Sequence, residues 1–294
     1  MSDQDAQSQP PLHPPRGQVG VGESLRSRLL SAEPLFGTFL GLGSALAAEA
    51  CAMAGFEWLL VDLEHGAGGE EALLGQLLAA AAHDVPAFVR VETAARVRIG
   101  RVLDLGAAGV MLPRMDSASQ VAAALRYLQY PPDGERGVAT YTRACWFGLQ
   151  PDYLDRANDD VVNIVQVESI GALNSVEEIA KIGGVHVLFV GPRDLTHALG
   201  IPGLTGAPEY VAALGRVRAA AHAAGIAAGV LAADEYAAQQ YAEQGFTFIG
   251  IGSDAALLAR GASTTVTALR PASISPRSDE PKVSSGQMAS RRVL

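Results

Sequence analysis

Short apolar segments alternate with longer segments of mixed polarity along most of the chain. The short segments are nearly continuous in hydrophobic residues and often β-branched, which is typical of strands that are buried on both faces. They predict eight strands, at residues 35–40, 58–63, 87–91, 109–112, 162–167, 185–190, 226–231 and 246–251.

The intervening segments predict helices, several of which begin near a Ser, Asn or Asp that can cap a helix N-terminus. These helices are expected at residues 45–54, 70–83, 94–105, 117–130, 175–182, 208–224 and 234–244, with a last one after Asp254. Residues 131–160 are too many for a plain link between a helix and a strand. Within them we expect a short extra strand at 137–139 and a short helix near 152–157.

Eight alternations of strand and helix without a break in composition favour one closed α/β domain, a (β/α)₈ TIM barrel. A doubly wound open sheet is the alternative. Both ends of the chain are polar and contain several Pro or Ser residues. We therefore predict a disordered N-terminal extension at 1–22, a barrel domain at 23–263 and a polar C-terminal tail at 264–294.

The 294-residue chain is acidic, with a formal net charge of −9. This charge argues against nucleic acid as a partner, because phosphate backbones are repelled by an acidic surface. No apolar run reaches the roughly 18 residues that a membrane span needs. The first 15 residues lack the apolar core of a secretory signal, so we predict a cytoplasmic location and no membrane partner.

Polar residues follow the predicted strands at their C-terminal ends, the face where barrel enzymes carry their active sites. Glu168 and Asp194 follow neighbouring strands, so their charges repel unless a cation lies between them. Oxygen ligands of this kind suit a hard cation such as Mg²⁺ or Mn²⁺, with water completing its shell. The alternative is that each carboxylate pairs with an arginine, such as Arg90 or Arg114.

Two further strand-end residues are candidates for chemistry. A neutral His65 that is oriented by Asp62 or Asp104 can act as a general base near pH 7, although a lone histidine is more often structural or simply exposed. Arg90 ends an otherwise apolar strand and needs a partner. That partner is either a substrate oxygen, whose developing charge Arg90 would stabilise, or an internal acid such as Glu64 or Glu92.

The segment Gly191-Pro192-Arg193-Asp194 opens the loop after the sixth predicted strand. The backbone N–H groups of Arg193 and Asp194 could receive a carboxylate, although Gly-Pro pairs are also common in plain turns. Only two lysines are present, Lys181 before the sixth strand and Lys282 in the polar tail. Neither is placed to form a Schiff base, so carbanion chemistry here would need a metal to stabilise an enolate.

Five segments, at residues 55–66, 89–91, 130–138, 165–169 and 189–195, resemble in order and spacing the HpcH/HpaI aldolase family. The likeness covers roughly residues 37–258. It rests on the combination of an Asp-x-Glu-His, a Gln-x-Glu and a Gly-Pro-x-Asp-Leu segment.

The resemblance implies a class II aldolase that joins a 2-oxo acid, usually pyruvate, to an aldehyde. Glu168 and Asp194 would hold the divalent metal, which would be Mg²⁺ or Mn²⁺, with Co²⁺ as a third choice. His65 would be the base or part of a proton relay, supported by Asp62 and Asp104. The family is typically hexameric, so a homo-oligomer is expected.

The resemblance also implies how the substrate is held. Arg90 would bind the keto oxygen, and Gln166 would line the site near the metal. The segment from Gly191 and Pro192 to the N–H groups of Arg193 and Asp194 would receive the carboxylate. Leu63 and Glu92 depart from the residues that many relatives carry beside the presumed acceptor, so they leave the aldehyde undecided. The alternatives are an oxaloacetate decarboxylase, a CoA-ester lyase, or a catalytically silent barrel that acts as a binding protein.

Overall fold

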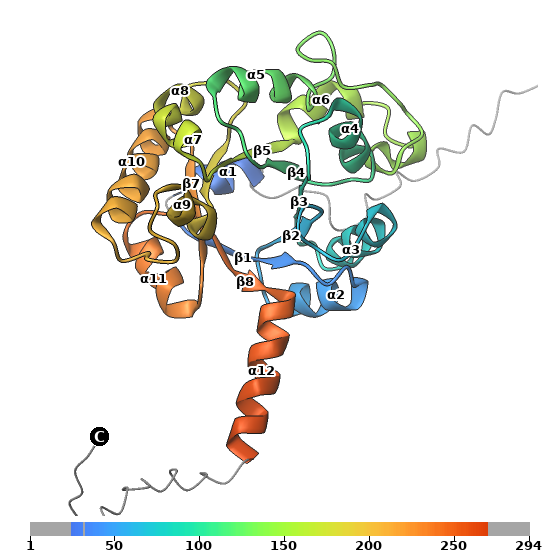
Figure 1. Ribbon diagram of the computed structural model, residues 1–294. Coiled ribbons are helices and arrows are strands. Elements are labelled where there is room, and N and C mark those ends of the chain that lie inside the picture. The colour runs from blue at the N-terminus through green and yellow to red at the C-terminus, as the bar shows by residue number, and fades with distance from the viewer. Residues whose placement is uncertain (1–24, 32, 270–294) are drawn as a thin grey trace, which may run out of the picture. The chain divides into compact units, whose positions relative to one another are not determined.

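The computed structural model describes residues 25–31 and 33–269, and within them eight parallel strands close into a barrel (Figure 1). The strands are β1 (Leu35–Leu40), β2 (Trp58–Asp62), β3 (Ala87–Arg90), β4 (Gly109–Leu112), β5 (Val162–Val167), β6 (Val187–Val190), β7 (Ala227–Ala232) and β8 (Phe248–Ser253). Strand β1 pairs with both β2 and β8, so the sheet has no free edge. The TIM barrel is thereby confirmed and the open sheet is excluded.

The described residues form twelve α-helices, of which those between successive strands surround the barrel in Figure 1. They are α1 (Leu25–Leu30), α2 (Ala45–Met53), α3 (Glu70–Ala82), α4 (Arg96–Asp104), α5 (Ala118–Arg126), α6 (Tyr153–Asp160), α7 (Ile170–Asn174), α8 (Val176–Ala180), α9 (Pro192–Ala198), α10 (Pro208–Ala224), α11 (Glu235–Glu243) and α12 (Asp254–Leu269), with a 3₁₀ helix η1 (Arg143–Gly148). No helix in this part of the chain is long and apolar enough to cross a membrane.

Some elements differ from their predictions. The expected strand at 137–139 is wrong, because those residues are irregular and the barrel, in which every strand has two neighbours, offers no free edge for pairing. The expected helix near 152–157 is confirmed as α6, whereas the short helices α1, α7 and α9 were not predicted. Helix α12 continues to Leu269, past the predicted boundary at residue 263; the predicted N-terminal extension and most of the predicted tail lie outside the described residues.

Large aromatic side chains fill the inside of the barrel. Trp58 stacks on Phe248 with 4.1 Å between ring centroids, and its indole N–H donates to the Leu35 carbonyl oxygen at 3.1 Å. A Cβ at Gly37 would lie 2.0 Å from the Trp58 ring, so this position must be glycine for the indole to fit. The barrel interior is therefore a packed core, and any chemistry must take place at one end of it.

A buried carboxylate organises the loop that follows β1. Asp254, at the start of α12, accepts the backbone N–H groups of Gly41 at 2.8 Å and Leu42 at 3.2 Å. This contact ties the end of β1 to the end of β8, where the barrel closes. The C-terminal rim is thus held by side-chain to backbone bonds as well as by the sheet.

Candidate active site

A buried ion pair joins the ends of β2 and β3. Asp62 and Arg90 are register partners in these strands, so their side chains emerge side by side. Arg90 donates from Nε to Asp62 Oδ1 at 2.9 Å and from Nη2 to Oδ2 at 2.6 Å, a bidentate geometry. Burial alone would raise the pKa of Asp62, but the hydrogen bonds and charge of Arg90 hold it below its ordinary value.

Glu64 links this pair to His65. Its Oε2 lies 3.4 Å from Arg90 Nη1 and 3.9 Å from His65 Nε2. Glu64 was named among the possible partners of Arg90 but was not predicted as a site residue, although it stands in the same strand-end segment. The other partner considered, Glu92, accepts Nε of Arg98 at 2.8 Å instead.

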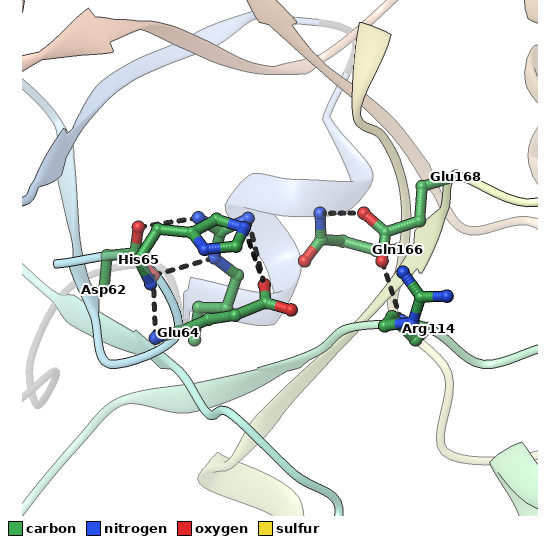
Figure 2. A network of polar contacts seen from close by, with 7 residues as sticks. Asp62, Glu64, His65, Arg114, Gln166 and Glu168 are labelled. Carbon is green, nitrogen blue, oxygen red and sulfur yellow. Dashed lines mark hydrogen bonds and ion pairs between the residues drawn. The ribbon is translucent and has the colours of Figure 1, made fainter. Parts of the chain in front are cut away.

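The backbone around His65 is held by Asp62. Asp62 Oδ1 accepts the N–H groups of Glu64 at 3.0 Å and of His65 at 3.2 Å. The His65 side chain itself is 67% exposed. Among the described residues, the carboxylate near its imidazole is that of Glu64. Asp62 therefore orients the turn that carries His65 rather than its ring (Figure 2).

Gln166 and Glu168 face this group from the end of β5 (Figure 2). Glu168 Oε2 accepts from Gln166 Nε2 at 2.8 Å, and Glu168 Oε1 accepts the backbone N–H of Arg114 at 2.8 Å. Both side chains are almost fully buried. Burial raises the pKa of Glu168, and the negative charges of Asp194 and Glu64 raise it further.

Gly191, between β6 and α9, marks the point where these polar groups converge. A Cβ placed on it would lie 3.4 Å from Glu168 Oε2, 3.5 Å from Gln166 Nε2 and 3.7 Å from Asp194 Oδ2. One oxygen from each of two carboxylates therefore borders the same small space. The missing side chain at Gly191 keeps that space open.

The donor set at this space fits a hard divalent cation. Two carboxylates with water and substrate oxygens are a common way to bind Mg²⁺. The Oε1 atom of Gln166 is buried and has no hydrogen-bond partner among the described residues, so an acceptor stands ready beside the two acids. The described residues contain no group of three His, Cys, Asp or Glu side chains that could hold a metal, so the remaining ligands would have to come from water or substrate.

The segment after β6 opens a short helix where the sequence predicted a loop. Gly191 is the N-cap of α9 and Pro192 opens the helix, so the N–H groups of Arg193 and Asp194 lie in its first turn. First-turn N–H groups have no partner within a helix. Asp194 lies in the same turn and supplies the carboxylate that borders Gly191.

Asp104 is the predicted site residue that the structure does not bring to the others. It is the last residue of α4, which runs back from the end of β3 toward the start of β4. Arg136, whose side chain is fully buried, donates from Nη2 to Asp104 Oδ1 at 2.8 Å. The direction of the helix therefore carries Asp104 away from the C-terminal rim and from His65.

Comparisons with known proteins agree on one family. A profile described as HpcH/HpaI aldolase/citrate lyase matches residues 35–261. The chain is 43% identical over 252 residues to a hydroxypyruvate/pyruvate aldolase of Paraburkholderia phytofirmans, covering 84% of this chain and 97% of the relative. It is 37% identical over 240 residues to a 4-hydroxy-2-oxo-heptane-1,7-dioate aldolase of Escherichia coli, covering 81% and 92%.

A solved structure supports the same relationship. The crystal structure of an HpcH/HpaI aldolase/citrate lyase family protein from Burkholderia cenocepacia J2315 matches this fold with a TM-score of 0.82. The two sequences are 42% identical, and the match covers 85% of this chain and 100% of the other.

Proposed function

The chain belongs to the HpcH/HpaI aldolase/citrate lyase family, and from that premise we propose that it is a divalent-metal-dependent aldolase. It would cleave and form 4-hydroxy-2-oxo acids through a pyruvate enolate and an aldehyde. The observation that carries the proposal is the convergence of Glu168 and Asp194 beside Gly191, facing the Asp62–Arg90 pair. Similarity to relatives with different named substrates leaves the aldehyde open.

Glu168 and Asp194 would hold the cation, Mg²⁺ or Mn²⁺ by preference and Co²⁺ as a further choice. When bound, the cation supplies a Lewis acid that stabilises the negative charge of the enolate. Two features of the chain support this assignment. The pKa of Glu168 is raised by burial and by neighbouring acids, which is the electrostatic setting that a cation relieves. The unpaired Oε1 of Gln166 can accept a hydrogen bond from a water that belongs to the cation's shell.

Arg90 would stabilise the oxyanion from the opposite side. Asp62 accepts the Nε–H and one Nη2–H of Arg90. The guanidinium N–H groups that are not bonded to Asp62 can donate to the keto oxygen as negative charge develops on it. Because the bidentate pair fixes the guanidinium in advance, little reorganisation is needed during the reaction. The N–H groups of Arg193 and Asp194 would receive the carboxylate of the pyruvate unit.

His65 would move the proton. In the cleavage direction Nε2 takes the proton of the 4-hydroxyl, the C3–C4 bond breaks, and its electron pair passes to C3 as the C4 carbonyl forms. In the synthetic direction the same proton returns to the new alkoxide. Glu64, 3.9 Å from Nε2, stabilises the imidazolium in between. Because Asp104 is bound to Arg136, we assign the support of His65 to Asp62 and Glu64.

The test is exchange of the pyruvate methyl protons with deuterium, followed by NMR in the absence of an aldehyde. We expect exchange with Mg²⁺ or Mn²⁺, its loss in a chelator, and its return when metal is restored. Exchange that persists in the chelator would refute the requirement for a metal. No exchange under any condition would favour a catalytically silent barrel that acts as a binding protein. Activity on oxaloacetate without use of any aldehyde would favour a decarboxylase, and activity on a CoA ester would favour a lyase of that kind.

Two further parts of the proposal concern the protein in solution. We propose a homo-oligomer, a hexamer by resemblance to the family, in the cytoplasm. The molar mass from light scattering tests the first, and cell fractionation tests the second. A monomer that is fully active would refute the need for assembly.

A further inference from the structure

Three arginines stand apart from the others in this acidic chain. The protein has 31 acidic and 22 basic residues, so carboxylate partners are abundant. In the part of the chain that the structure describes, the guanidinium groups without a hydrogen bond or ion pair are those of Arg96, Arg114 and Arg193. Arg96 lies beside Gly137, whereas Arg114 donates its backbone N–H to Glu168 and Arg193 directly precedes Asp194 in the chain.

Arg114 adopts a backbone conformation that is costly for its residue type. It follows β4 with a φ of 53°, in the left-handed region, which costs roughly 1–2 kcal/mol for a residue with a Cβ. This conformation turns its N–H onto Glu168 Oε1 at 2.8 Å. A glycine would make the same backbone contact without the strain, so the arginine side chain itself needs an explanation. Figure 2 shows that side chain beside Glu168, at the rim of the site.

Arg193 is also placed against a local preference. It lies in the first turn of α9, where the positive end of the helix disfavours a cationic side chain. It follows Gly191 by two residues and directly precedes Asp194. Glu168 lies next to both backbone segments, because its Oε1 accepts the Arg114 N–H and its Oε2 borders Gly191, two residues before Arg193. Local rules are broken most often at functional sites, and here two are broken in the backbone segments next to Glu168.

We propose that Arg114 and Arg193 form an anion subsite at the rim of the active site, which binds a carboxylate at the far end of the acceptor aldehyde. The inference rests on the proposed aldolase function. Arg90 and the first turn of α9 already serve the keto oxygen and carboxylate of the donor in that function. A guanidinium presents a planar fork that matches a second carboxylate, and both arginines are exposed, so a substrate can reach them.

The test compares two four-carbon aldehydes that differ in charge, 4-oxobutanoate and butanal, with saturating pyruvate and metal. The measured quantity is the ratio of kcat/KM for 4-oxobutanoate to kcat/KM for butanal. We expect Arg114→Gln and Arg193→Gln each to lower this ratio about 10- to 100-fold, as for the loss of a hydrogen bond to a charged group. Most of the change should appear in KM for 4-oxobutanoate.

Arg126→Gln is the matched control. Arg126 is an exposed arginine in the last turn of α5, at the other end of the barrel, where it pairs with Glu135. Its replacement removes the same charge from the protein, and the ratio should stay within twofold of the wild type. Arg114→Lys keeps the charge at the rim and should lose less selectivity than Arg114→Gln.

The possible results distinguish a failure of the anion subsite from a failure of the aldolase function on which it rests. If the wild type exchanges the pyruvate methyl protons but neither glutamine variant changes the ratio, the subsite is wrong and the aldolase proposal stands. A wild type without exchange and without aldehyde use refutes both. Because the two arginines lie on different elements, a fall in stability of one variant leaves the other to decide.

Discussion

A methyl group at Gly191 should block the cation site without disturbing the fold. Gly191 has a φ of −90° and a ψ of 99°, which alanine adopts without strain. The added Cβ would meet its nearest atoms at 3.4–3.7 Å, which is ordinary van der Waals contact. Those atoms are oxygens of Glu168 and Asp194 and the amide nitrogen of Gln166, so the methyl would occupy the space between the two carboxylates.

We expect Gly191→Ala to keep or raise the free energy of unfolding but to weaken the binding of the cation. In metal-free protein, Gly191→Ala should leave the free energy of unfolding unchanged or raise it by up to about 1 kcal/mol, because alanine restricts the unfolded chain. The affinity for Mn²⁺ should fall about 10- to 100-fold, in the range seen when groups around ligating residues are changed. Calorimetric titration with Mn²⁺ and thermal unfolding of the same samples measure both.

A second glycine provides the control. Gly215 lies in α10, and a methyl group added there would meet no described atom within 4 Å outside the backbone of its own helix. Gly215→Ala should therefore add about 0.8–1 kcal/mol to the free energy of unfolding through helix propensity alone. Its Mn²⁺ affinity should equal that of the wild type. If Gly191→Ala binds Mn²⁺ as tightly as Gly215→Ala does, the space beside Glu168 and Asp194 is not where the cation sits.

Three other predictions concern the charged groups of the site. Folding raises the pKa of Glu168 above its ordinary value of 4.5. The protonated carboxyl therefore favours the folded state at pH values below 4.5, and this contribution is lost as the pH rises through the pKa of Glu168 in the folded protein. Glu168→Gln should therefore raise the melting temperature of metal-free protein at pH 7 but not at pH 4; equal shifts at both would contradict the argument. Asp62→Asn should cost about 2–4 kcal/mol in urea unfolding, because Arg90 then lacks its buried partner, and a cost below about 1 kcal/mol would show that water replaces it. His65→Ala should lower kcat about 100-fold or more with unchanged Mn²⁺ affinity, and an unaffected kcat would remove His65 from the mechanism.

The sequence predicted the barrel because the information for it is local. Each buried strand is a short run of apolar residues, and the longer helices between the strands begin at recognisable breaks, so the eight alternations are visible without any contact between them. Residues 137–139 show where this reasoning fails. They resemble a strand in isolation, but every strand of the closed barrel already has two neighbours, and no edge remains for them.

The residue types of the site were also visible in the sequence, because polar residues at strand ends contrast with the apolar strands before them. Which of them meet was decided by tertiary structure. Arg90 takes Asp62 as its main partner because the two are opposite each other in the register of β2 and β3. Glu92, only two residues from Arg90, pairs with Arg98 instead.

The order of elements and the chemistry available at their ends were thus determined by the sequence alone. The open space at Gly191, the link from Glu64 to Arg90 and the position of Asp104 depend on register, on the direction of each helix and on side chains from distant strands. A local pattern states which residues follow a strand. Only the closed barrel sets the distances between strands. Those distances decide which charged groups pair with each other and which can bind the same cation or substrate.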